Sequence, residues 1–215
     1  MKKEEQIELT KDFVKKHLEN DASGHDWWHI VRVAELAKTI AMKEQADLFI
    51  CEMSALLHDI ADEKLNATEA EGLKKVRDWL YAIAMDESSI SKIISIISGM
   101  SYKGGGQPAM QTLEGKVVQD ADRLDAIGAI GIARTFAYAG SKGDLIYNPA
   151  MAPREKITKE EYRSGKSTAI NHFYEKLLKL KELMNTDYAK LLAKERHQFM
   201  EIYLQQFFKE WQGKK

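Results

Sequence analysis

The chain has 215 residues, of which 44% are hydrophobic and 30% are charged, a balance that excludes wholesale disorder. With 32 basic and 33 acidic side chains the formal net charge is -1, so we expect no general attraction to nucleic acid or to a membrane surface. The single cysteine, Cys51, excludes an intramolecular disulfide framework, and we find no signal peptide and no apolar run near the roughly 18 residues of a membrane span. We therefore expect a cytoplasmic protein with one domain over residues 1–215.

Apolar residues recur at helical spacing along most of the chain. In chain order, the pattern predicts helices over about 4–19, 28–41 and 48–58, then from a capping box at Thr68 and Glu71 to about residue 84, then around 90–97. One long helix is expected over about 113–138, and two more over about 170–184 and 192–207. Because isoleucine and valine also recur here at helical spacing, the predicted fold class is all-α.

Glycine and proline gather in two stretches, 99–108 and 140–153, which we expect to be long loops. Loops of this length in a compact domain are commonly functional. The C-terminal helices, over about 155–212, either complete the core of the monomer or form a dimer interface. The sequence leaves both open, and we favour a homodimer.

Histidine and aspartate cluster at three places in the chain: GHDWWH at 24–29, HDIAD at 58–62 and QDADRLD at 119–125. Imidazole nitrogens and carboxylate oxygens are suitable ligands for a divalent ion such as manganese, iron, cobalt or zinc. A centre with two histidines and two aspartates differs from the closed zinc site of a structural module, because it leaves room for water and substrate oxygens. The three clusters therefore indicate a catalytic metal centre.

The order His29, then the doublet His58-Asp59, then Asp122 resembles the H…HD…D signature of the HD-domain metal-dependent phosphohydrolases. Small bacterial HD proteins are similar at GHDWWH (24–29), ALLHDIAD (55–62) and DADRLDAIGAIG (120–131), so the resemblance covers about residues 20–150. It implies an HD-type helical bundle in which His29, His58, Asp59 and Asp122 hold one divalent cation. Mn²⁺ is the expected ion, with Mg²⁺, Co²⁺, Fe²⁺, Ni²⁺ and Zn²⁺ as alternatives.

Three aspartates of the last cluster compete for the fourth ligand position. In HD proteins the ligand directly precedes Arg-Leu or a similar pair, which carries over to Asp122. Helix geometry agrees, because at about 100° per residue Asp122 shares a face with Asp125, whereas Asp120 points about 160° away. We expect Asp125 to support the ligand, and Gly128 and Gly131 to permit close packing nearby.

Asp62 follows His58 by four residues and Asp59 by three, so that on a helix it would reach the same side. This spacing is similar to the HDxxE or HDxxD extension of nucleotide-hydrolysing HD proteins. The resemblance implies that Asp62 is a general acid or base, beside Asp59 as catalytic residue and metal ligand. The alternative, to which we give equal weight, is that Asp62 has a structural role at a helix end and is bonded to Lys64 or to solvent.

Substrate phosphates need cationic partners in addition to the metal. Lys103 lies in a glycine-rich loop whose backbone amides can approach an anion, and Arg123, Arg134 and Lys142 lie on or just after the predicted helix of Asp122. By resemblance, we expect Lys103 and Arg134 to bind substrate phosphate, and from their place in the chain Lys142 and Arg123 are further candidates. For any one of them, a solvated lysine or a structural arginine is the alternative.

A second motif, HDWWH at 25–29, is superficially similar to the HExxH of zinc metalloproteases. Aspartate replaces the glutamate base, and Gly24 indicates that the helix has barely begun, so we disfavour this interpretation. We expect Trp27 and Trp28 to lie in the core, with stacking on a nucleobase as the alternative.

The resemblance implies an enzyme that hydrolyses (deoxy)nucleoside triphosphates to a monophosphate and pyrophosphate through a metal-activated water. A 5′-nucleotidase, or another phosphomonoesterase or phosphodiesterase of the same superfamily, is the alternative within this class. From another class, the alternative is a non-catalytic regulatory helical protein that is stabilised by a metal. The expected partner is a small nucleotide, with neither nucleic acid nor membrane.

Overall fold

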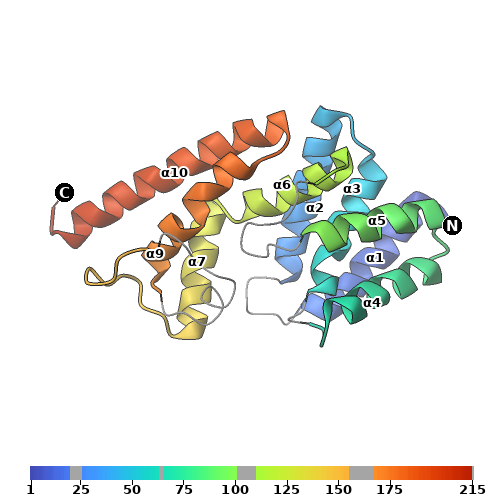
Figure 1. Cartoon of the computed structure of the whole chain (residues 1–215), viewed down its shortest axis with the longest axis horizontal. Coiled ribbons are helices and arrows are strands. Elements are labelled where there is room, and N and C mark those ends of the chain that lie inside the picture. The colour runs from blue at the N-terminus through green and yellow to red at the C-terminus, as the bar shows by residue number, and fades with distance from the viewer. Residues whose placement is uncertain (20–25, 63–64, 101–109, 155–166, 215) are drawn as a thin grey trace. The chain divides into compact units, whose positions relative to one another are not determined.

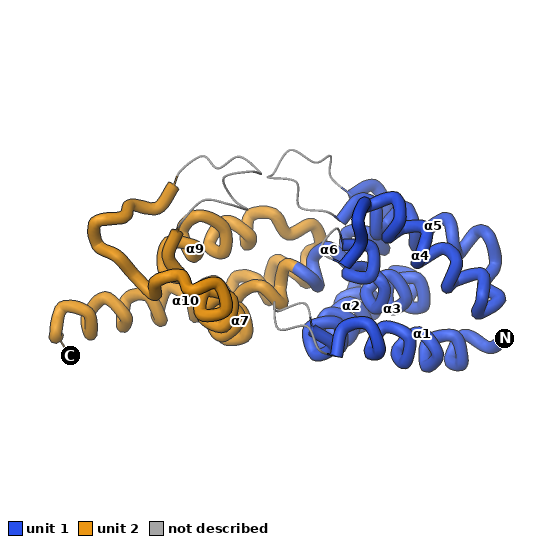
Figure 2. The backbone as a smooth tube through the Cα atoms, turned by 90° about the horizontal axis from the view of Figure 1, so that it is seen from below, with its two compact units in different colours: residues 1–122 blue, residues 123–215 orange. Residues whose placement is uncertain are grey.

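The computed structural model describes residues 1–19, 26–62, 65–100, 110–154 and 167–214, most of which are helical (Figure 1). Among these residues, the one backbone pairing of β type is an isolated bridge between Leu145 and Thr168, so the predicted all-α class is confirmed. No helix in this part of the chain is long and apolar enough to cross a membrane. Residues 1–122 and 123–215 form two compact units, shown in separate colours in Figure 2. The expected single domain and the expected homodimer stay predictions.

The first unit contains, in chain order, α1 (Lys3–Leu18), α2 (Trp27–Glu44), α3 (Leu48–Leu57), the 3-10 helix η1 (His58–Ala61), α4 (Glu69–Ala82), α5 (Glu87–Met100) and most of α6 (Leu113–Asp125). Helix α3 contacts α1, α2 and α5. Its sequence, LFICEMSALL, is apolar on almost every face, and each of its residues after Leu48 is buried. The buried α3 thereby places His58, the next residue along the chain, inside the unit.

Side-chain caps set the first residues of several helices in this unit, among them α2 and α4. Asp26 precedes α2, and its carboxylate accepts a hydrogen bond of 2.8 Å from the backbone N–H of His29. Thr68 precedes α4, and its hydroxyl accepts a hydrogen bond of 3.2 Å from the backbone N–H of Glu71. The helix start that the sequence predicts at Thr68 is therefore confirmed.

Helix α4 packs closely against η1 at Gly72. A Cβ atom added at Gly72 would lie 2.5 Å from the carbonyl oxygen of Ala61, so this contact requires glycine. Nearby, Nδ2 of Asn66 donates to the carbonyl oxygens of Ile60 at 2.8 Å and Asp62 at 2.9 Å. Together these contacts hold the turn that begins with the His58-Asp59 doublet.

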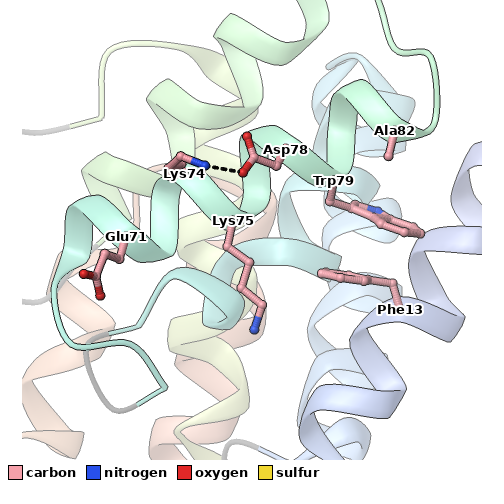
Figure 3. Close-up of a pocket in the computed structure, with 7 residues that line it drawn as sticks. All are labelled: Phe13, Glu71, Lys74, Lys75, Asp78, Trp79 and Ala82. Carbon is pink, nitrogen blue, oxygen red and sulfur yellow. Dashed lines mark hydrogen bonds and ion pairs between the residues drawn. The ribbon is translucent and has the colours of Figure 1, made fainter.

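Aromatic side chains join α1 to α4. The rings of Phe13 and Trp79 stack with centroids 4.1 Å apart, and the indole N–H of Trp79 donates to Oγ1 of Thr10 at 3.0 Å. Figure 3 shows this stack beside a surface depression of about 420 Å³, with Lys74 paired to Asp78 on the same helix. None of the described residues lining the depression belongs to the predicted site, so we assign it to the packing of α1 on α4.

The second unit contains the end of α6, followed by α7 (Gly128–Lys142), α9 (Ala169–Glu175), the 3-10 helix η2 (Leu177–Leu183) and α10 (Asp187–Trp211). Helices α7 and α9 contact each other, α7 also contacts α10, and η2 contacts both α9 and α10. The rings of Phe136, Phe173 and Tyr203 meet between these helices, with centroid separations of 6.2, 6.0 and 5.9 Å. This aromatic cluster, in which Phe173 is fully buried, helps to hold α7, α9 and α10 together.

Two of the predicted helices are wrong in extent. The helix expected over about 113–138 is two helices, because α6 ends at Asp125 and Gly128 adopts a left-handed backbone conformation with φ 75°. The helix expected over about 170–184 ends at Glu175, because Lys176 leaves the helical region with φ -135° and ψ -59°.

Both predicted loops begin later in the chain than expected. Gly99 belongs to α5, and residues 101–109 lie outside the described part. Residues 140–142 belong to α7, whereas 144–154 contain no helix.

Candidate metal centre

Four side chains from α2, η1 and α6 converge inside the first unit. Nε2 of His29 lies 3.5 Å from Oδ2 of Asp59 and 3.5 Å from Oδ1 of Asp122. Nε2 of His58 lies 3.2 Å from Oδ1 of Asp59 and 3.9 Å from Oδ1 of Asp122. The fold thus brings together all four residues that the sequence predicts as metal ligands.

The backbone of α3 orients the His58 ring. Nδ1 of His58 lies 2.7 Å from the carbonyl oxygen of Ala55, an atom that can only accept, so Nδ1 carries the proton. In the neutral imidazole, Nε2 is then the unprotonated nitrogen and faces the carboxylates, which is the tautomer that a metal requires. Sequence reasoning missed Ala55, because a backbone acceptor has no side-chain signal in the sequence.

The centre is buried on one side and open on the other. The side chains of His29, His58 and Asp59 are 0%, 5% and 8% exposed, whereas that of Asp122 is 40% exposed. Burial is the largest single influence on the pKa of His58 and lowers it, but the carboxylates of Asp59 and Asp122, the bond to Ala55 and the carboxylate of Asp62 together outweigh burial, so the pKa is raised. The excess of carboxylate charge that produces this rise also favours a bound cation.

The donor atoms fit a divalent cation. His29, His58 and Asp59 each offer one ligand atom, and these atoms all lie within 4.8 Å of one another. Nε2 of His58 is buried and has no hydrogen-bond partner among the described residues, which is costly unless another group binds there. Two imidazoles with two carboxylates suit manganese, iron, cobalt or zinc, and four protein donors leave positions for further oxygens.

Asp62 does not lie on the same helical turn as His58, so that part of the prediction is wrong. Residues 58–61 form the 3-10 helix η1, and Asp62 follows it with an extended backbone at ψ 140°. Its carboxylate is nevertheless close enough to His58 to contribute to the raised pKa of the imidazole. An acid–base role for Asp62 stays a prediction.

The two predicted phosphate-binding arginines both have contacts inside the second unit. NH1 of Arg134 lies 2.7 Å from Oδ2 of Asp125, and the side chain of Asp125 is only 2% exposed. NH1 of Arg123 donates to the carbonyl oxygen of Leu183. These are the contacts expected of structural arginines, and phosphate binding by either residue stays a prediction.

The two predicted phosphate-binding lysines differ in what the structure describes. Nζ of Lys142 lies 5.6 Å from the centroid of the Tyr138 ring on α7. Lys103 lies outside the described residues. Phosphate binding by these lysines also stays a prediction.

Of the HDWWH segment, residues 26–29 lie in the described part of the chain. Helix α2 begins at Trp27 with Asp26 as its cap, and His29 lies in its first turn. His25 itself lies outside the described residues. Trp28 is 64% exposed, and its predicted place in the core is therefore wrong.

Known proteins are similar to this chain over nearly its whole length. Residues 27–127, which include the four converging side chains, match the model of the HD domain family. YpgQ of Bacillus subtilis, an uncharacterized protein, is 43% identical over 99% of this chain and 97% of its own length.

Three crystal structures illustrate the likeness in fold. YpgQ in complex with ADP has a TM-score of 0.77 and 42% identity, covering 95% of this chain and 97% of that one. A HD-superfamily hydrolase from Bacillus thuringiensis has a TM-score of 0.79 and 50% identity, covering 98% and 99%. A protein from Lactobacillus plantarum has a TM-score of 0.85 and 44% identity, covering 98% of each chain.

Proposed function

Because this chain belongs to the HD-domain superfamily, we propose that it is a metal-dependent phosphohydrolase that acts on nucleotides. The favoured substrates are ribo- or deoxyribonucleoside triphosphates, cleaved at the α-phosphorus to a monophosphate and pyrophosphate. The observation that carries this proposal is the convergence of His29, His58, Asp59 and Asp122. The similar HD-superfamily hydrolase supports hydrolysis, and the complex of YpgQ with ADP supports a nucleotide substrate.

His29, His58, Asp59 and Asp122 would hold one divalent cation, for which we favour Mn²⁺. Such an ion supplies Lewis-acid polarisation of a phosphoryl oxygen and lowers the pKa of the attacking water. The protein prepares the site in advance, because the bond to Ala55 points Nε2 of His58 inward without help from a ligand. The side chain of Asp122 is 40% exposed, and we infer that a substrate would approach the metal from the side of Asp122.

The remaining roles fall to charged residues around this centre. Asp62, half-buried next to η1, would move a proton to or from the reacting oxygens, with Asp59 beside it. Lys103, Lys142, Arg123 and Arg134 would balance the phosphate charge. A guanidinium has five N–H donors, so an arginine can bind a carboxylate and a phosphate at once.

The test is hydrolysis by the purified protein with Mn²⁺ and a panel of NTPs, dNTPs and dNMPs, with products separated by chromatography. We expect monophosphate and pyrophosphate, and loss of activity by a factor of at least about 100 in His58→Ala, because a metal ligand is removed. The matched control is His17→Ala, since His17 also bonds through Nδ1 to a helix carbonyl but is exposed on α1.

Each other outcome contradicts a defined part of the proposal. Nucleoside and phosphate as products would make the protein a 5′-nucleotidase. Full activity in His58→Ala, or equal losses in both histidine variants, would contradict the metal centre. Inactivity of the metal-loaded wild type on every nucleotide would contradict the substrate class.

A further inference from the structure

Within the second unit, charged side chains from α7 and α10 bond to Leu124 and Asp125, the last two residues of α6. Oδ2 of Asp125 lies 2.7 Å from NH1 of Arg134 on α7. From α10, NH1 of Arg196 donates to the carbonyl oxygen of Leu124 at 2.5 Å. The carbonyl oxygen of Leu124 also accepts from the backbone N–H of Ile127 at 3.2 Å, so Arg196 adds a second, side-chain donor at the C-terminal end of α6.

Arg196 reaches α6 along a fixed path. A Cβ atom added at Gly128 would lie 3.0 Å from Cγ and 3.1 Å from Cβ of Arg196, so the arginine stem lies directly over the glycine. Gly128 also has φ 75°, a conformation that suits glycine. Burial lowers the pKa of Arg196 from its ordinary value, and the neighbouring carboxylate of Asp125 opposes that change. The guanidinium is thus partly desolvated and pointed at the end of α6.

Asp122 lies in this same last turn of one continuous helix, Leu113–Asp125. Its carboxylate is 3.5 Å from Nε2 of His29 but is 40% exposed, so side-chain packing does little to hold it. Its position therefore depends on the backbone of its own turn. A turn that frays would move the carboxylate away from the two histidines.

We propose that Arg196 is a positioning residue for the metal ligand Asp122, acting through the backbone of the last turn of α6. This inference rests on the metal centre of the proposed function. Arg196 is 74 residues from Asp122 in sequence and belongs to none of the three histidine–aspartate clusters. Because Arg196 would act only through the turn that carries Asp122, replacing Arg196 should weaken metal binding only while Asp122 is a ligand.

The test is a double-mutant cycle on the affinity of the full chain for Mn²⁺, measured by titration calorimetry on metal-stripped protein. We expect Arg196→Met to weaken Mn²⁺ binding by about 10-fold in the wild-type background and by less than about 2-fold in the Asp122→Asn background. Arg77→Met is the matched control, because Arg77 lies on α4 with its side chain 40% exposed and its NH1 3.7 Å from Oε1 of Glu87. The affinity of this variant should equal that of the wild type.

Circular dichroism establishes that each variant is folded before titration. If Arg196→Met does not fold, Arg196→Lys is the second variant: it keeps a charged stem over Gly128 and should weaken binding by a smaller factor with the same dependence on Asp122. Unchanged affinity in a folded Arg196 variant, or the same loss in both backgrounds, would overturn the inference alone. A wild type that binds no Mn²⁺ would instead overturn the proposed function.

Discussion

Replacing Gly72 with alanine should destabilise the protein and disturb the His58-Asp59 turn. The new Cβ atom would lie 2.5 Å from the carbonyl oxygen and 2.7 Å from Cα of Ala61, both of which are backbone atoms. Ordinary contacts begin near 3.5 Å, so α4 and η1 would have to separate by roughly 1 Å. Because η1 carries two of the proposed metal ligands, a shift of this size also changes the metal centre.

The size of the effect follows from three opposing contributions. Alanine favours a helix interior over glycine by about 1 kcal/mol. Overpacking against the backbone costs about 1–3 kcal/mol. The new Cβ atom would also lie 2.8 Å from Nδ2 of Asn66, whose bonds to Ile60 and Asp62 contribute about 1 kcal/mol each. We therefore expect a net loss of about 2–4 kcal/mol, which lowers the unfolding midpoint by roughly 4–16 °C for a chain of this size.

The assay is thermal unfolding followed by circular dichroism, with Mn²⁺ affinity measured on the same samples. Gly140→Ala on α7 is the matched control, because a Cβ atom at Gly140 meets nothing within 4 Å. It should keep the wild-type Mn²⁺ affinity and gain up to about 1 kcal/mol from helix propensity. If Gly72→Ala were as stable as Gly140→Ala, the close contact of α4 with η1 would not exist as described.

Three further predictions concern the caps, the metal and pH. Asp26→Ala should lose about 1 kcal/mol of unfolding free energy in urea, because the backbone N–H of His29 loses its acceptor. Asp26→Asn keeps an acceptor and should lose much less. Equal losses in the two variants would contradict the cap. Mn²⁺ at about 100 times its Kd should stabilise the wild type by about 2.7 kcal/mol in thermal unfolding. EDTA should reverse this stabilisation, and His58→Ala should abolish it. An unfolding midpoint of the wild type that does not change with Mn²⁺ would contradict the metal centre. Burial, aided by the positive charge of Lys176, lowers the pKa of His172 from 6.5 to about 4, so the folded state binds the proton less tightly than the unfolded state. The difference in unfolding free energy between the wild type and His172→Gln should therefore be constant above about pH 6.5 and fall by on the order of 3 kcal/mol towards pH 4. If urea titrations gave the same difference at all these pH values, the lowered pKa of His172 would be refuted.

The order of residues in the sequence was enough to predict the fold class and to find the four residues that converge in the fold. Helical periodicity and the cap at Thr68 depend on residues three or four positions apart, and these interactions are present in any segment that becomes helical. His29, the His58-Asp59 doublet and Asp122 were found from motif order, since each motif is short and contiguous. The end of α6 was missed, because the long apolar pattern continues across Gly128 and outweighs one glycine when periodicity is counted.

The environment of each predicted residue was decided by tertiary packing. The family resemblance implies phosphate binding by Arg134, but it does not indicate that the fold places NH1 of Arg134 2.7 Å from Asp125, a carboxylate buried at the end of a different helix. The bond from Arg196 to Leu124 joins residues 72 positions apart, and the contact at Gly72 depends on how closely α4 approaches η1. Distances between residues far apart in the chain are set by how whole helices pack, and no local pattern of residue types encodes them.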